Sequence, residues 1–194
     1  MTLSDAQAVN LTIAGNRNQF RVLVDKYQKP LYDLALRMTG NPQDAADITQ
    51  TAFLKMYNAL SRYDGRHPFL NWAYSITLNT ARNHLRHKTV VKFLSLDFRL
   101  GGAEENDGPC VDVHDRRQDA EDMFAAGELL KKLERGLLRL PQDLRAAFIL
   151  FHLHNNTVKD VAFQCGVSEN AINIRLSRAR TLLYKSIDIK EARK

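Results

Sequence analysis

Residues 157–180 read TVKDVAFQCGVSENAINIRLSRAR, and this stretch decides the fold of the C-terminal half of the chain. Thr157 followed three residues later by Asp160 is typical of a capping box at the start of a short helix, because each side chain can bond to the other residue's backbone N–H. Gly166 then predicts a tight turn, and Ser168 with Glu169 predicts the start of a second helix. The stretch therefore predicts two helices joined by a sharp turn.

The second of these helices has two contrasting faces. An apolar stripe with spacings of 4, 3 and 4 residues consists of Ile172, Leu176, Ala179 and Leu183. The opposite side carries Asn170, Asn173, Ile174, Ser177, Arg178 and Thr181, flanked by Arg175 and Arg180. A helix that enters the major groove needs short polar groups and arginines near its start. The stretch is thus interpreted as a helix-turn-helix; a solvated basic surface helix is the plainer alternative.

The N-terminal half also predicts helices in succession. Apolar residues recur over 20–38 at spacings of 4, 3, 4, 3 and 4, namely Phe20, Val24, Tyr27, Leu31, Leu34 and Met38. The sequence Gly40-Asn41-Pro42 is typical of one helix ending and another beginning. The next helix would turn Ile48, Ala52, Met56 and Ala59 inward, and Asp44, Asp47, Gln50 and Thr51 toward its outer side.

A third helix, opened by Pro68, begins apolar and becomes basic. Phe69 and Trp72 are predicted to be core residues, because buried aromatics are more often core than platforms for bases. Beyond them, Asn79, Asn83 and Arg86 share one face at i, i+4 and i+7, with Arg82 beside it. Amides and cations next to aromatic residues suit unstacked bases and a single-stranded backbone. This face therefore predicts a second nucleic-acid contact.

Charge divides the chain in the same way. The net charge is +6, but residues 61–93 hold six basic and one acidic side chain, residues 94–128 hold three and ten, and residues 129–194 hold thirteen and six. Two basic segments around an acidic one are expected of two phosphate-binding surfaces. Residues 95–126 lack helical periodicity until about Asp119 and contain Gly101-Gly102 and Gly108-Pro109, so we expect a flexible linker between two small domains, 1–94 and 127–194.

Several classes of protein are not expected. There is no run of about 18 apolar residues and no basic start followed by an apolar stretch, so the sequence predicts neither a membrane span nor a secretory signal. Two distant cysteines favour a reduced, cytoplasmic protein. Cys110 and His114 provide only two ligands on a linker, so no metal site or other cofactor is predicted. Phosphate-loop, nucleophile-elbow and two-metal patterns are absent from the sequence, so we do not expect an enzyme.

These residues together resemble the extracytoplasmic-function (ECF) group of the sigma-70 family, over nearly the whole chain except the linker. Residues 44–53, DAADITQTAF, are similar to the family's acidic helix, and residues 69–76, FLNWAYSI, followed by Asn79, are similar to its aromatic segment. Leu140-Pro141 with Arg145, Phe148 and Leu150 resembles the start of its C-terminal domain. Residues 166–168, GVS, and 175–180, RLSRAR, resemble its helix-turn-helix.

The resemblance implies an all-α fold and a role for each segment. Polymerase core would be bound by Asp44, Asp47, Gln50, Thr51 and Phe53. The minus-ten element would be captured and held open by loop 61–68 and the basic helix, through Tyr63, Arg66, Asn79, Arg82, Asn83 and Arg86. The minus-thirty-five element would be read as duplex by Ser168, Asn170, Asn173, Ile174, Arg175, Ser177, Arg178 and Arg180. Asn173 and Ile174 stand where the family often has lysine and serine, and Asn83 where some members have aspartate, so base preference is not carried over.

The implied function is that of a non-catalytic transcription initiation factor. It would bind core RNA polymerase, direct it to promoters and help to open the duplex. The family also implies an inhibitory anti-sigma protein, either soluble or membrane-bound, and a membrane-bound one would tether the chain at the membrane.

Two alternatives stay open from the sequence. A stand-alone helix-turn-helix repressor or activator would bind a palindrome as a dimer without polymerase. A nucleic-acid enzyme would depend on Asp44 and Asp47, the nearest approach to a carboxylate cluster in the chain.

Overall fold

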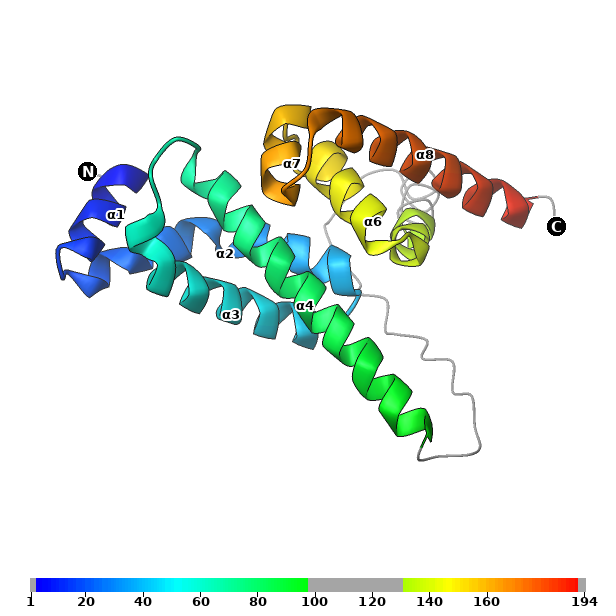
Figure 1. Cartoon of the computed structure of the whole chain (residues 1–194), viewed down its shortest axis with the longest axis horizontal. Helices are drawn as coiled ribbons and strands as arrows, with labels where there is room; N and C mark the ends of the chain where they lie inside the picture. Colours follow the sequence, from blue (N-terminus) through cyan, green and yellow to red (C-terminus); the bar gives the residue numbers. More distant parts are fainter. Residues whose placement is uncertain (1–2, 98–130, 192–194) are drawn as a thin grey trace, which may run out of the picture.

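The computed structural model describes residues 3–97 and 131–191, with side chains over 3–90 and 131–186, and every regular element in those ranges is helical. The predicted all-α fold is confirmed. The main helices are α1 (Asp5–Ile13), α2 (Phe20–Thr39), α3 (Pro42–Ala59), α4 (Phe69–Asp97), a helix over residues 131–139, α6 (Gln142–Phe148), α7 (Val158–Cys165) and α8 (Glu169–Glu191) (Figure 1). Short 3-10 turns lie at Arg17–Gln19 and Leu60–Arg62, and a π-helical turn at Ile149–Leu153.

The turn between α2 and α3 forms as the sequence predicts. Gly40 ends α2 in the left-handed conformation, with φ of +69°. The Asn41 side chain accepts a hydrogen bond from the Asp44 backbone N–H at 3.0 Å, and Pro42 occupies the first helical position. Because a left-handed residue and an N-cap each satisfy backbone groups that a helix end leaves free, the two helices can reverse direction within a few residues.

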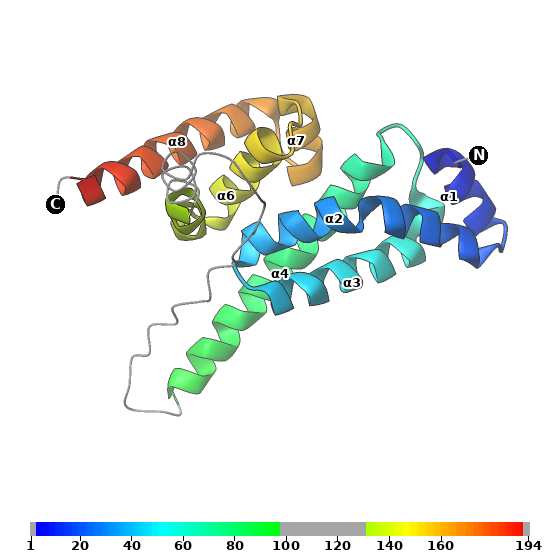
Figure 2. The same ribbon diagram turned by 180° about the vertical axis from the view of Figure 1, so that it is seen from behind.

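Helices α2, α3 and α4 pack together into a bundle (Figure 2). The predicted apolar face of α2 is buried at Tyr27, Leu31, Leu34 and Met38. Its first two members, Phe20 and Val24, are only partly buried. The buried row runs back from Leu31 in steps of four to Leu23, and Phe20 and Val24 therefore lie on the flank of the bundle, where they line a groove.

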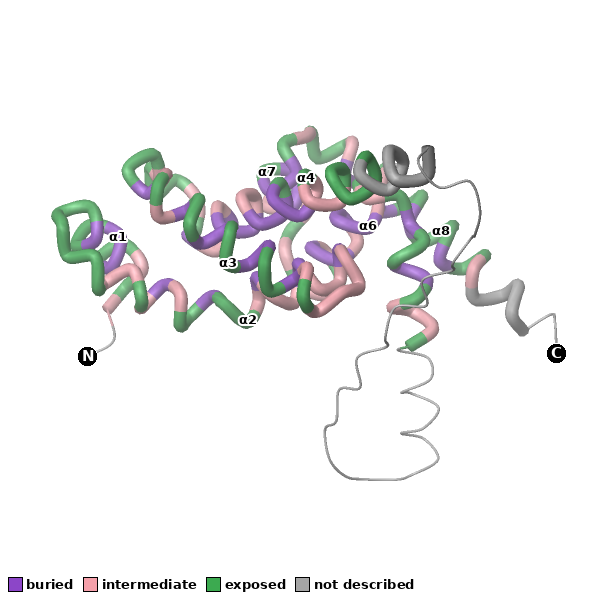
Figure 3. Tube along the Cα trace, turned by 90° about the horizontal axis from the view of Figure 1, so that it is seen from below, coloured by how far each residue is buried: buried purple, intermediate pink, exposed green. Residues whose placement is uncertain are grey.

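The C-terminal region contains the predicted helix-turn-helix. Thr157 and Asp160 form the capping box of α7, and Gly166 turns the chain with φ of +68°. The Ser168 hydroxyl accepts a hydrogen bond from the Ala171 backbone N–H at 3.3 Å, which caps α8. The apolar stripe of α8 is buried along its whole predicted length, at Ile172, Leu176, Ala179 and Leu183 (Figure 3).

The two helical regions pack directly on each other. Helix α7 lies against α4, and α6 approaches the end of α2 (Figures 1 and 2). The buried Arg145 guanidinium donates to the Leu140 carbonyl at 3.0 Å and also to the carbonyls of Leu138 and Met38. Met38 belongs to the last turn of α2, where backbone carbonyls have no hydrogen-bond partner within the helix. Arg145 supplies a donor to the Met38 carbonyl and thereby joins the two regions.

Helix α4 shows the consequence of this packing. The sequence predicts an apolar side formed by Phe69, Trp72, Ala73 and Ile76. Phe69 and Ala73 are buried, and Trp72 and Ile76 are partly buried. Tyr74, on another side of the helix, is also buried, and its hydroxyl lies 2.9 Å from Nδ1 of His154 in the C-terminal region that packs on α4. The helix also continues to Asp97, three residues past the predicted domain boundary at 94.

Candidate nucleic-acid interface

The residues predicted to bind polymerase lie on α3, but they do not form one uniform surface. Asp47, Gln50 and Thr51 are exposed, as expected. Phe53 is buried, and together with Gln50 it lines a groove between α2 and α3. The groove walls are otherwise mainly apolar, formed by Phe20, Val24, Tyr32, Leu54 and Tyr57. Leu54 is 60% exposed and is continuous with these apolar walls, so it extends the apolar surface beyond the groove.

Asp44 differs from the other acidic residue of this set. Its side chain is only 16% exposed and lies 2.7 Å from Nζ of Lys88 and 3.2 Å from Nε2 of His84, both on α4. Partial burial raises the pKa of Asp44, but the hydrogen bond and charge of Lys88 outweigh it, so the pKa lies below its usual range. The prediction that Asp44 lies on the outer side of α3 is therefore corrected: its carboxylate joins α3 to α4.

The predicted minus-ten residues on α4 do come together. Asn79, Arg82, Asn83 and Arg86 line one hollow, whose far end includes Thr89 and Val90. Arg86 donates to the side-chain oxygen of Asn83 at 3.0 Å. Amide and guanidinium groups around a concave surface can donate to phosphate and to base edges together. Gln142 of α6 closes one side of the same hollow.

The loop that precedes α4 places its two predicted residues differently. Tyr63 packs its ring against Phe69 and Trp72, and its hydroxyl donates to the carbonyl of His67 at 2.8 Å. Burial raises the pKa of Tyr63, so this side chain shapes the loop rather than projecting from it. The Arg66 side chain is 83% exposed, and its Nε lies 3.2 Å from the carboxylate of Asp64. Of the two, Arg66 is the side chain placed to reach a strand.

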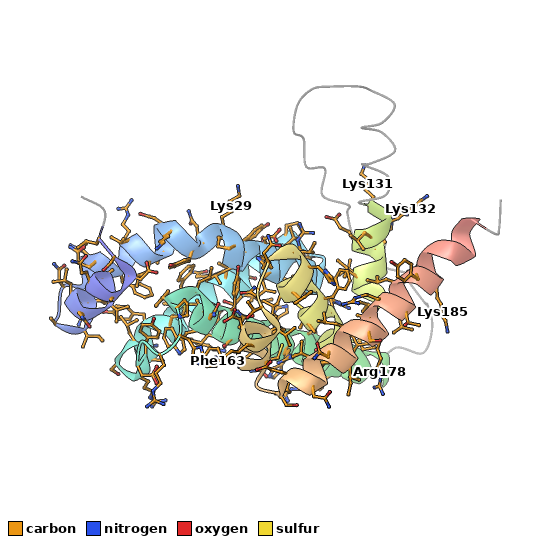
Figure 4. The ribbon with its side chains drawn as sticks, turned by 90° about the horizontal axis from the view of Figure 1, so that it is seen from above. Lys29, Lys131, Lys132, Phe163, Arg178 and Lys185 are labelled. Atoms are coloured by element: carbon orange, nitrogen blue, oxygen red, sulfur yellow. The ribbon has the colours of Figure 1, made fainter. Side chains whose placement is uncertain are left out.

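The predicted reading face of α8 is open along most of its length. Ser168, Asn170, Asn173, Ile174, Ser177, Arg178 and Arg180 are exposed. Figure 4 shows Arg178 projecting from α8 on the side of the molecule away from Lys29 of α2. Arg175 is the exception, because only 22% of its side chain is exposed and it lies 3.6 Å from the carboxylate of Asp143.

Asp143 is a residue that sequence reasoning missed. It stands in the first turn of α6 and contacts Arg82 at 2.8 Å as well as Arg175, so one carboxylate meets a cation from each predicted DNA surface. His154 is a second. Its Nε2 lies 3.4 Å from Asp33 of α2, and burial lowers its pKa. Asp143 is one of six acidic residues in the basic segment 129–194, and both of its partners are distant in sequence, so no local pattern distinguishes it.

Other kinds of site find no support where the structure can be examined. Over residues 3–97 and 131–191, no group of three or more metal-ligating side chains lies together, and no helix is long and apolar enough to cross a membrane. Asp44 and Asp47, the carboxylates on which a nucleic-acid enzyme would depend, have different surroundings: Asp44 pairs with Lys88 of α4, whereas Asp47 is exposed.

Two family descriptions match the chain in the order in which its helical regions occur. "Sigma-70 region 2" matches residues 23–90, which hold α3 and most of α2 and α4. "Sigma-70, region 4" matches residues 130–183, which hold α6, α7 and most of α8. The acidic segment between them lies outside both matches.

Relatives match over the full length. The RNA polymerase sigma-H factor of Pseudomonas aeruginosa is 31% identical over 187 residues, covering 94% of this chain and 93% of its own. The ECF RNA polymerase sigma factor SigW of Bacillus subtilis is 27% identical, with 89% and 91% covered. Among solved structures, the fold is similar to CnrH in complex with the cytosolic domain of CnrY (TM-score 0.64, 24% identity, 94% and 96% covered) and to RpoE in complex with the anti-sigma factor NepR from Bartonella quintana (TM-score 0.66, 20% identity, 88% and 97% covered). With both regions matched in order and a relative above 30% identity across the whole length, the chain belongs to the ECF group of the sigma-70 family.

Proposed function

We propose that this protein is a transcription initiation factor that binds core RNA polymerase, brings it to a promoter and helps to separate the strands. The observation that carries the proposal is the presence of two different nucleic-acid surfaces on one chain. The α8 face is convex, exposed and polar, as duplex reading requires, whereas the α4 hollow is concave and lined by amides and guanidinium groups, as a separated strand requires.

The groove between α2 and α3 is the proposed docking surface for polymerase. Its apolar walls and the exposed Leu54 would bury against a partner, which gains free energy from the area removed from water. Asp47, Gln50 and Thr51 rim the same side and would give the contact its polar specificity. Phe53 supports the groove wall from below, and Asp44 holds α3 against α4 so that the surface keeps its shape.

Strand separation would be driven by contacts that the protein makes with unpaired bases and not with paired ones. Bases that leave the duplex stack lose pairing and stacking, and contacts to Arg66, Asn79 and Asn83 would offset this loss. The α8 helix would anchor the factor on paired DNA at a fixed distance from that site. No covalent chemistry is required, and the protein would act in the cytoplasm, where polymerase and promoter are found.

An anti-sigma protein is the proposed inhibitor. The solved structure of RpoE from Bartonella quintana contains an anti-sigma factor, and the fold of the present chain is similar to that sigma factor. An inhibitor that covered the apolar groove would compete directly with polymerase for the same exposed leucine.

The deciding experiment is a promoter-binding assay with and without polymerase core. We expect weak duplex binding by the chain alone and specific binding once core is added. A stand-alone repressor or activator would instead bind its palindrome tightly without core, and that result would contradict the proposal.

Two substitutions separate the two surfaces. Arg178→Ala should weaken specific binding of the holoenzyme by about 1–3 kcal/mol, if Arg178 reads a base edge. Arg17→Ala removes the same charge from an exposed residue far from α8 and serves as its control.

Asn79→Ala should impair opening, measured by permanganate reactivity of unpaired thymines, and leave core binding intact. Asn10→Ala on α1 is the matched control, and loss of core binding in step with opening would show that the α4 face is wrongly assigned.

A further inference from the structure

We infer that Ile174 of α8 contacts the C5 methyl group of a thymine in the minus-thirty-five element, and thereby makes one base pair of that element specific for thymine. The inference rests on the proposed function, because it assumes that α8 enters the major groove of promoter DNA. It names the chemical group that is read on the DNA and the side chain that reads it.

Ile174 occupies the centre of the exposed face of α8. It lies two residues after Ile172 and two residues before Leu176, and both of these belong to the buried stripe. At 3.6 residues per turn, this spacing directs Ile174 to the opposite side of the helix. Its side chain is 45% exposed, although isoleucine is among the residue types most often buried in proteins. A single exposed apolar residue is common on protein surfaces, so its surroundings have to show what it contacts.

The side chains around Ile174 are polar and exposed. Asn170 precedes it by four residues, and Ser177 and Arg178 follow it by three and four, so these residues share its side of the helix. Figure 4 shows Arg178 projecting from the helix. A specific protein–protein interface buries about 800 Å² on each partner, far more than one aliphatic side chain provides. The expected partner of Ile174 is therefore a small apolar group that lies among hydrogen-bonding groups.

The major groove of duplex DNA contains one apolar group of this kind, the C5 methyl of thymine. Guanine, adenine and cytosine present acceptors or donors there. An isoleucine against one of those polar atoms would remove it from water without supplying a hydrogen bond, which weakens binding. The same side chain against a methyl group gains the free energy of apolar burial. Ile174 thus favours thymine by attraction and disfavours the other bases by desolvation.

The side chain of Ile174 and its neighbours suit this contact. A β-branched residue in a helix has essentially one χ1 rotamer, so little conformational entropy is lost when the contact forms. The Asn170 amide and the Ser177 hydroxyl can bond to bases or phosphates, and Arg178 supplies a cation. The polar neighbours would hold the helix in the groove, while Ile174 would determine the preference at one base pair.

Deoxyuridine tests the methyl group alone, because it keeps the base pair and the O4 acceptor of thymine and lacks only the C5 methyl. Holoenzyme assembled from the full chain and polymerase core first selects promoters from duplexes with a randomised minus-thirty-five region. Each thymine of the selected element is then replaced singly by deoxyuridine, on either strand, and the Kd is measured at one salt concentration. With the wild-type chain, one replacement should weaken binding by roughly threefold to fivefold, as expected for the loss of one methyl contact.

Ile174→Ser removes the apolar group, and serine and isoleucine have similar helix propensities, so α8 should stay folded. This variant should bind the thymine and deoxyuridine duplexes equally well. Leu182→Ser is the matched control, because Leu182 is 43% exposed on the same helix but lies about two turns farther along. The control should keep the full loss at the sensitive thymine.

Three results would overturn the assignment of Ile174. The wild-type holoenzyme could be insensitive to every deoxyuridine, Ile174→Ser could remain as sensitive as the wild type, or Leu182→Ser could lose the sensitivity as well. The proposed function is tested first and separately, by the selection step. A wild-type holoenzyme that selects no promoter would contradict the proposed function, and the role of Ile174 would fall with it.

Discussion

Arg145 offers the sharpest test of how the two helical regions are held together. Its guanidinium is 8% exposed and donates to three backbone carbonyls, those of Met38, Leu138 and Leu140. Desolvation lowers the pKa of Arg145, which shows that burial of its charge is costly and that the hydrogen bonds must offset this cost. Arg145→Met keeps the aliphatic volume but leaves three carbonyls without a donor.

The size of the effect follows from those carbonyls. A buried acceptor without a partner costs about 1–3 kcal/mol, and part of that loss is offset because the variant no longer has to remove a charged guanidinium from water when it folds. We therefore expect Arg145→Met to lower the free energy of unfolding by about 3 kcal/mol. Arg139→Met is the control, because Arg139 is exposed, and it should change stability by less than about 0.5 kcal/mol.

Urea unfolding followed by far-ultraviolet circular dichroism measures both variants. Since Met38 lies in α2, helices of both regions should unfold earlier in Arg145→Met, and the transition should separate into two steps if the regions uncouple. A loss below about 1 kcal/mol would refute the reasoning, because the three carbonyls would then be satisfied by water and Arg145 would not join the regions.

Two further predictions concern the region contact and the turns. Burial lowers the pKa of His154, and the nearby Asp33 carboxylate only partly opposes this shift, so the imidazole is neutral in the packed form. The packed form should therefore keep its full stability above pH 6.5, the ordinary pKa, and lose it as pH falls below that value, because the separated or unfolded form takes up the proton first. The thermal midpoint of His154→Gln, measured from pH 5 to 8, should lack this part of the pH dependence; identical curves would contradict the assignment. Gly166→Ala should cost about 1 kcal/mol from its left-handed conformation alone, since a Cβ there meets nothing within 4 Å. Gly40→Ala should cost more, because its Cβ would lie 2.6 Å from Cδ1 of Leu138; equal losses in urea titrations would show that the clash relaxes freely.

Local signals explain why much of the fold could be predicted. The stripe of α8, the capping box of α7 and the Gly40-Asn41-Pro42 turn each depend on residues within one or two helical turns of each other. Such patterns can be interpreted from the sequence alone, because the spacing of apolar side chains determines which face of a helix is buried. The exposed reading face of α8 could be predicted for the same reason, as the complement of its buried stripe.

Contacts between distant segments could not be predicted from spacing. Asp44 looks like a free acidic residue in the sequence, but its partners Lys88 and His84 come from another helix. Tyr74 lies outside the apolar side that the sequence predicts for α4, and its hydroxyl meets His154 of the C-terminal region. Helical periodicity shows one apolar face clearly, but it does not show a second face that is covered by polar as well as apolar contacts. Helix α4 is covered on two sides, so the apolar side predicted from its sequence is narrower than the buried surface that the structure shows.

Three polar side chains that pack between the two helical regions share one property. Asn71, Arg82 and Arg175 are polar groups suited to nucleic acid, and in this structure each is bound to a polar group of the other region or, for Arg175, to the same carboxylate as Arg82. A guanidinium that pairs with an internal carboxylate has fewer N–H donors left for a phosphate, and part of its charge is neutralised. A factor with two accessible basic surfaces would instead bind DNA anywhere through phosphate contacts, without polymerase. Asp143, at the start of α6, neutralises part of both basic surfaces in this structure, because it lies 2.8 Å from Arg82 and 3.6 Å from Arg175, and the sequence alone does not reveal this pairing.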